Sequence, residues 1–195
     1  MSHVEVLRRV IICDRNGKIK FDSGLQPSNS FVIAFLQHIY GTFKDVDISI
    51  RNSADAAITV KAPSGTAYAR HHIGAGDNDD TFGLVVGTGT TPETNTDYAL
   101  DTQIAHGTGA GQLDYGAHSF TATAVVGSNV DMVVSRSFYN GSGSSITVRE
   151  IGIYCQSRYA TGYAYFCTLR DVLGTPGVVN NTETLTLQYT FRTTV

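Results

Sequence analysis

The chain has 195 residues, enough to bury one hydrophobic core but too few for two ample domains. A hydrophobic share of 42% excludes a disordered chain, and a net charge of -3 gives no electrostatic reason to expect nucleic acid or an acidic membrane as a partner. No apolar run reaches the length of a membrane span and no secretory signal is visible, so we expect synthesis in a cytoplasm. Only 16% of the residues are charged while Gly, Thr and Ser are abundant, which is typical of many short strands joined by tight turns.

The N-terminal residues predict a hairpin. Residues 4–13 are rich in β-branched side chains, and residues 18–22 form the return strand. Between them lies Asn16-Gly17, the strongest short turn signal for a hairpin.

The next segment predicts an amphipathic helix near residues 28–43. Its large apolar residues recur every four positions, at Phe31, Phe35, Ile39 and Phe43. Pro27 and either Ser28 or Asn29 supply start signals. Because one face of the helix is broadly apolar, we expect it to cover the open end or one face of a sheet.

After the helix the hydrophobic period returns to two. Residues 46–51 and 57–62 are short strand candidates, and residues 63–80 are predicted to form a long loop. Residues 82–86 read as a buried strand, and residues 97–104 as a short helical turn.

The C-terminal half predicts five strands, at residues 115–126, 130–140, 145–156, 163–170 and 184–194, separated by turn clusters that include residues 174–181. In the last strand Leu185, Leu187, Tyr189 and Phe191 alternate with polar residues. The sequence therefore predicts a mainly β fold, a jelly-roll-like antiparallel β-sandwich of two sheets. We expect one domain, residues 1–195, with the N-terminal hairpin and the helix as parts of it.

One charged pair is predicted to be structural. A turn at residues 140–144 would pair Arg136 with Val148 and place Arg136 diagonally beside Glu150 on an apolar face, as a buried salt bridge. Beyond Glu150 the apolar residues move from even-numbered to odd-numbered positions. This change makes Gly152 a natural position for a β-bulge. No second carboxylate is placed to act with Glu150 in catalysis.

Three cysteines are too few for a disulfide framework. A hairpin centred near Thr161 would set Cys155 opposite Cys167 and Ile153 opposite Leu169. We favour two reduced, buried thiols, and a disulfide is the alternative.

The motifs that resemble catalytic or cofactor sites are incomplete. Residues 87–91 and 107–111 match phosphate loops only in composition, and no nucleophile elbow is present, so we assign no catalytic residue and no cofactor. His71 and His72 would point to opposite faces of a strand, and no zinc spacing accompanies them. Asp77, Asp79 and Asp80 are the best calcium candidates, but a solvated acidic loop is the favoured interpretation because the ligand pattern is incomplete.

Several segments together resemble a family of virion structural proteins of tailed phages and related viruses: residues 13–18, 28–32, 87–89, 97–100, 107–111, 135–140 and 148–154. The likeness extends from about Arg8 to the C-terminus and consists of structural turns and strand starts. It implies a β-sandwich subunit on the particle exterior, capsid-associated, decoration or tail, present in several copies. It transfers no catalytic residue.

The expected function is therefore that of a non-enzymatic virion subunit, made in the host cytoplasm, which binds itself as a homo-oligomer and other virion proteins such as major capsid or tail proteins. Neither nucleic acid nor a membrane is an expected partner. The alternative is a receptor- or glycan-binding module of a phage tail or fibre. Exposure of Tyr159, Tyr163 and Tyr165 in one patch would favour that alternative, because aromatic rings stack on sugars.

Overall fold

The computed structural model describes residues 3–28, 31–62 and 71–194. The elements in chain order are β1 (His3–Cys13), β2 (Ile19–Asp22), β3 (Gln26–Pro27), α1 (Ile33–Lys44), β4 (Ile48–Arg51), β5 (Ala57–Val60), β6 (Gly83–Gly87), β7 (Asp114–Val126), β8 (Asn129–Tyr139), β9 (Ile146–Tyr159), β10 (Gly162–Val179) and β11 (Thr184–Thr194). All strand pairs between these elements are antiparallel, which confirms the prediction of a mainly β fold with one helix.

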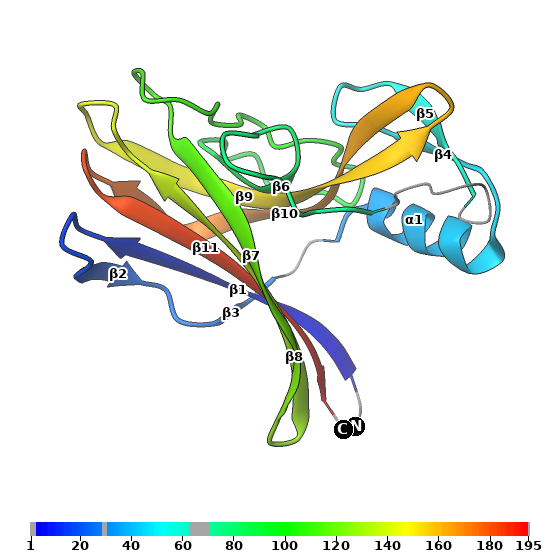
Figure 1. Cartoon of the computed structure of the whole chain (residues 1–195), viewed down its shortest axis with the longest axis horizontal. Coiled ribbons are helices and arrows are strands. Elements are labelled where there is room, and N and C mark those ends of the chain that lie inside the picture. Colours follow the sequence, from blue (N-terminus) through cyan, green and yellow to red (C-terminus); the bar gives the residue numbers. More distant parts are fainter. Residues whose placement is uncertain (1–2, 29–30, 63–70, 195) are drawn as a thin grey trace.

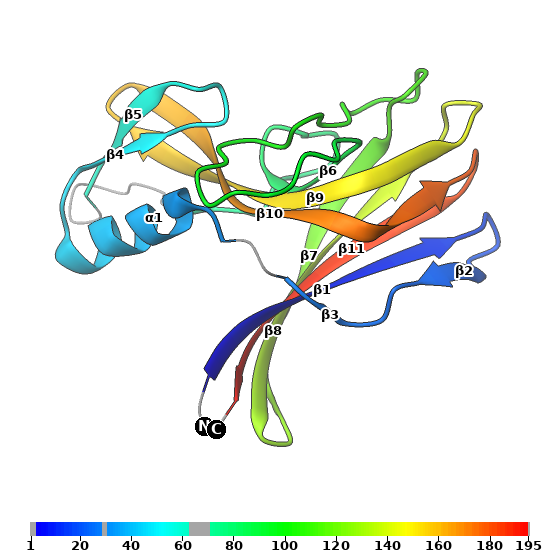
Figure 2. The ribbon, with the colours of Figure 1, turned by 180° about the vertical axis from the view of Figure 1, so that it is seen from behind.

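The strands form three sheets. The largest has the order β2-β1-β11-β8-β7, with β3 also paired to β1; a second has the order β10-β9-β6; and β4 and β5 form a two-stranded ribbon. Figure 1 shows that the two larger sheets lie side by side at one end of the molecule and diverge at the other. Strands β9 and β10 run toward α1, whereas β1, β11, β8 and β7 continue away from it, to the end where both termini lie (Figures 1 and 2).

Both larger sheets contribute to one hydrophobic core. In the six-stranded sheet, Val10 of β1 lies opposite Leu187 of β11, and both are buried. The neighbouring β9 supplies Val148 and Ile151, which are fully buried. Side chains alternate across a strand, so the strict alternation of residues 185–191 puts one face of β11 in this core, as the sequence predicts.

The N-terminal hairpin is confirmed. Strands β1 and β2 pair through a turn in which Gly17 has a φ of 78° and its N–H donates to the Asp14 carbonyl at 2.9 Å. The Asn16 N–H donates to Asp14 Oδ1 at 2.9 Å. Gly17 suits this position because a residue without Cβ adopts positive φ without strain.

Helix α1 begins at Ile33, later than the predicted start near residue 28, and residues 29–30 lie outside the described ranges. The residue before it, Val32, makes no side-chain cap. Instead, the Val32 N–H donates to the Thr168 carbonyl at 3.2 Å, and the Ile33 N–H to the Asn95 carbonyl at 2.7 Å. Tertiary partners therefore satisfy the first amides, so local capping signals misplace the start.

Two predicted connections are wrong. Strand β8 pairs with β11 and β7, while β9 pairs with β10 and β6, so the expected hairpin around residues 140–144 does not form. The predicted turn at 174–181 is largely occupied by β10, whose register is irregular between Val172 and Gly177 and then resumes. Residues 97–104 contain no helical turn.

Candidate functional site

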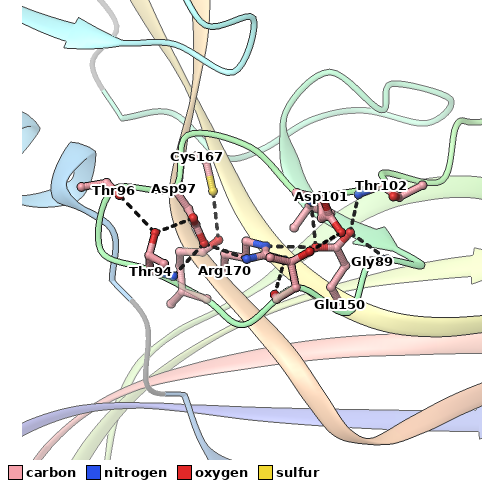
Figure 3. Close-up of polar contacts among 12 residues, drawn as sticks. Gly89, Thr94, Thr96, Asp97, Asp101, Thr102, Glu150, Cys167 and Arg170 are labelled. Carbon is pink, nitrogen blue, oxygen red and sulfur yellow. Dashed lines mark hydrogen bonds and ion pairs between the residues drawn. The ribbon is translucent and has the colours of Figure 1, made fainter.

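The carboxylate of Glu150 is fully buried in β9 and binds a segment far away in the sequence (Figure 3). It accepts hydrogen bonds from the backbone N–H groups of Gly89, Asp101 and Thr102, at 3.0, 3.0 and 2.7 Å. These residues belong to the covering segment, defined here as residues 88–105 between β6 and β7. Three backbone donors satisfy most of the lone pairs of a carboxylate that has left water.

Arg170 of β10 completes this buried network. Its Nε donates to Glu150 Oε2 at 3.0 Å, and its Nη1 donates to Asp97 Oδ2 at 2.7 Å (Figure 3). Its Nη2 binds the Thr91 carbonyl at 2.9 Å. Burial by itself lowers the pKa of Arg170, but the Asp97 and Glu150 carboxylates outweigh it and the pKa is raised. The network therefore joins the covering segment to two strands with its charges paired.

The predicted Arg136–Glu150 salt bridge is wrong because the two residues lie in different sheets. Arg136 is 1% exposed, and its guanidinium binds five backbone carbonyls, those of Gly76, Asp79, Phe82, Leu84 and Gly116, at 2.6 to 3.3 Å. Burial lowers its pKa, and nearby acidic side chains act in the opposite direction. Arg136 therefore ties the acidic loop and the start of β6 to β8.

The calcium candidates do not share a site. Asp79 Oδ1 accepts the N–H of Thr81 at 2.9 Å, and Asp80 Oδ2 accepts the N–H of His106 at 2.7 Å. Asp77 is exposed. Within the described ranges, the one group of residues close enough to hold a metal is a different one. Asp79 and Asp80 instead accept backbone N–H groups of nearby loops.

Gly152 has a different role from the predicted bulge. The register shifts in β10, between Cys167 and Leu169, and not in β9. A Cβ at Gly152 would lie 2.7 Å from the Leu169 carbonyl oxygen and 3.1 Å from Leu100 Cδ2. Glycine is required here because the bulged strand and the covering segment approach the β9 backbone closely.

The two buried cysteines are free thiols, as favoured from the sequence. They are one residue out of the predicted register: Cys155 lies opposite Phe166, and Cys167 opposite Tyr154. The predicted pairing of Ile153 with Leu169 is confirmed. Burial raises the pKa of Cys155 to about 12, so the thiol is protonated at neutral pH.

A second polar cluster, which the sequence did not predict, lies where α1 meets β9. His38 of α1, His71 and Cys155 of β9 have ligand atoms that all lie within 4.8 Å of one another. Ser157 is beside them, with its Oγ 3.0 Å from His38 Nε2 and accepting the His71 N–H at 3.0 Å. His71 and His72 do diverge, since the His72 ring packs on Phe82.

An apolar groove of about 540 Å³ lies between the diverging sheets. We call it the apolar groove. Phe31 and Phe35 stack at one wall, with ring centroids 4.0 Å apart. Phe120, Met132 and Phe191 of the six-stranded sheet also line it.

The core face of the six-stranded sheet continues past this groove. Val4 of β1 shares a cross-strand row with Thr193, Val130 and Val125, on the same side as the buried residues of these strands. The exposed fractions of Val4 and Val125 are 75% and 77%. We call residues 120–134 of the β7–β8 hairpin the projecting arm; it extends from the body of the molecule in both views (Figures 1 and 2).

The three tyrosines do not form one exposed patch. Tyr163 is exposed, whereas Tyr159 and Tyr165 are half-buried, and Tyr165 stacks on Phe82 with centroids 5.8 Å apart. In the described part of the chain, no helix is long and apolar enough to cross a membrane.

The sequence predicted that Glu150 and Arg136 are buried. It did not predict the groups that bind either residue, and it did not predict the histidine cluster. The signal for Glu150 was present in Gly87 and Gly89, where a Cβ would lie 2.6 and 2.5 Å from Glu150 Oε1. These glycines make room for a carboxylate, not for a phosphate. No family model matches the chain, and no curated protein or solved structure is significantly similar to it.

Proposed function

We propose that this chain is a non-enzymatic structural subunit of a virus particle, capsid-associated or part of the tail, that acts by self-assembly and by binding other virion proteins. The observation that carries the proposal is the uncovered apolar face of the six-stranded sheet. An exposed apolar surface that is bordered by polar residues is typical of a protein interaction site. The resemblance of the sequence to virion structural proteins points to the same function.

The edge strand β7 offers a route to self-assembly. It has 13 residues, forms one end of the sheet order, and pairs only with β8 among the described strands. Its outer backbone groups can therefore pair with the same edge of a second copy around a twofold axis. The apolar groove is then left for a neighbouring virion protein, such as a major capsid or tail protein.

The first test is the mass of the purified protein in solution, by light scattering after size exclusion, followed by its location in intact particles by mass spectrometry and labelled electron microscopy. We expect an oligomer in solution and the chain in the particle. A strict monomer that is absent from particles would overturn the proposal.

The arm itself is tested by Val125→Asp, which puts a charge in the proposed interface. We expect the oligomer to dissociate, since an unpaired charge is costly to bury. Ser128→Asp, at the exposed tip of the same hairpin, is the matched control and should leave the oligomer intact.

A receptor- or glycan-binding module of a tail or fibre is the alternative function. A glycan that binds the wild type and is lost with Tyr163→Ala, while Val125→Asp binds it normally, would favour this alternative.

A further inference from the structure

The cluster of His38, His71 and Cys155 has the composition of a transition-metal site. Two imidazoles and one thiolate suit Zn²⁺, which takes nitrogen and sulfur ligands, whereas Ca²⁺ and Mg²⁺ require oxygen ligands. The three residues come from α1, from the segment before β6 and from β9. An ion here would join three parts of the chain that are far apart in sequence.

The ligand atoms of His38 and Cys155 are almost as close as those around a tetrahedral ion. Bonds of about 2.0 Å to nitrogen and 2.3 Å to sulfur put neighbouring ligand atoms about 3.5 Å apart. Cys155 Sγ lies 3.7 Å from His38 Nε2, and all three ligand atoms lie within 4.8 Å of one another. Small side-chain rotations are therefore enough to close the site.

His38 is already oriented as a ligand. Its Nδ1 lies 2.8 Å from the carbonyl oxygen of Ala34, one helical turn earlier, and only Nδ1–H can donate to a carbonyl. That bond places the Nε2 lone pair toward Ser157 and Cys155. Metal-binding histidines commonly donate their other N–H to a carbonyl in this way.

His71 supplies an independent observation. Its Nδ1 is buried and has no hydrogen-bond partner within the described ranges. Its backbone is held at a φ of 59°, in the left-handed region that residues other than glycine adopt uncommonly. A buried nitrogen without a partner is costly, and a bound cation would satisfy it.

We propose that His38, His71 and Cys155 together bind one Zn²⁺ ion, with the Ser157 hydroxyl beside the fourth coordination position. Binding replaces the S–H bond of Cys155 by a sulfur–zinc bond and releases that proton to water. His71 also lines the apolar groove, which gives the ion a path to the site. The site is independent of the proposed assembly function.

The test is titration of the purified, reduced full chain with Zn²⁺ and with Co²⁺ as a spectroscopic probe. We expect one equivalent of Zn²⁺, a raised melting temperature that a chelator reverses, and the thiolate-to-cobalt charge-transfer band of a bound Co²⁺ ion. Absence of tight binding, or binding of copper without zinc, would overturn the proposal.

Two matched pairs of variants locate the ion. Cys155→Ala and His71→Gln should lose the equivalent of Zn²⁺ and the charge-transfer band. Cys167→Ala, a buried thiol on the adjacent strand, and His72→Gln, the exposed neighbour, should keep both. If Cys155→Ala fails to fold by circular dichroism, His71→Gln carries the test, because His71 lies at the groove. Unchanged binding in the folded variants would assign the ion to another site and overturn the proposal.

Discussion

The two ends of the six-stranded sheet have the same alternation of apolar and polar residues but differ in what covers them. At one end, Val10, Leu187 and Phe138 are buried with the three-stranded sheet in a common core. At the other end, Val4 and Val125 continue the same face into solvent. Alternation therefore defines which side of a strand is apolar, and the arrangement of the other elements decides where that side is buried.

Removing the buried carboxylate should have the largest effect. Glu150→Ala leaves the Arg170 guanidinium and three backbone donors partly unsatisfied, so we expect a loss of about 3–5 kcal/mol in the free energy of unfolding. Urea denaturation followed by circular dichroism measures it. The control is Asp131→Ala, which breaks the pair of hydrogen bonds, each of 2.7 Å, between Arg192 of β11 and Asp131 of the projecting arm. That pair is partly exposed, and we expect a much smaller loss than for Glu150→Ala; equal losses would contradict the comparison.

Overpacking at the covering segment should come next. A Cβ at Gly89 would lie 2.5 Å from both Asp101 Cβ and Glu150 Oε1. We expect Gly89→Ala to lower the free energy of unfolding by about 1–3 kcal/mol. Gly174→Ala, where a Cβ meets nothing within 4 Å, should change it little. Thermal and urea unfolding of both variants check this, and a neutral Gly89→Ala would show that the covering segment is loosely held.

His118 of β7 lies two residues before the projecting arm, at the boundary with the covered end of the sheet. Its Nε2 accepts the Leu84 N–H at 2.7 Å, and burial, with Arg136 nearby, lowers its pKa to about 4. Because the unfolded chain takes up a proton near pH 6.5 and the folded chain does not, stability should fall as the pH drops from about 6.5 to 4. His118→Gln does not titrate, and its stability should decline less over this range. Parallel pH profiles of the two proteins would contradict the prediction.

The smallest effect on folding is expected in the arm. Val125 is so exposed that Val125→Asp should change the free energy of unfolding of the monomer by about 0.5 kcal/mol or less. The same variant should abolish self-association. Denaturation at low protein concentration separates these two effects, and a large loss of monomer stability would show that the arm belongs to the core.

The elements that the sequence predicted well are those with a local signal. The Asn16-Gly17 turn and the alternation of β11 depend on residues close together in the chain, and both are confirmed. The start of α1 was misplaced because its first amides bind carbonyls of residues 95 and 168, which no local capping rule includes. His38 does not belong to the predicted apolar stripe, and its burial has the same origin: its partner Ser157 is 119 residues away.

Local sequence patterns predict a mainly β chain with one helix, the dry face of its last strand and two buried charged residues in its C-terminal half. The assignment of β8 and β9 to different sheets is seen only in the folded chain, where Glu150 pairs with Arg170 and Arg136 binds carbonyls. Side-chain periodicity predicts which face of a strand is buried, but it does not predict with which other strand that strand pairs. The covered and uncovered ends of the six-stranded sheet differ for that reason, although their sequence patterns are alike.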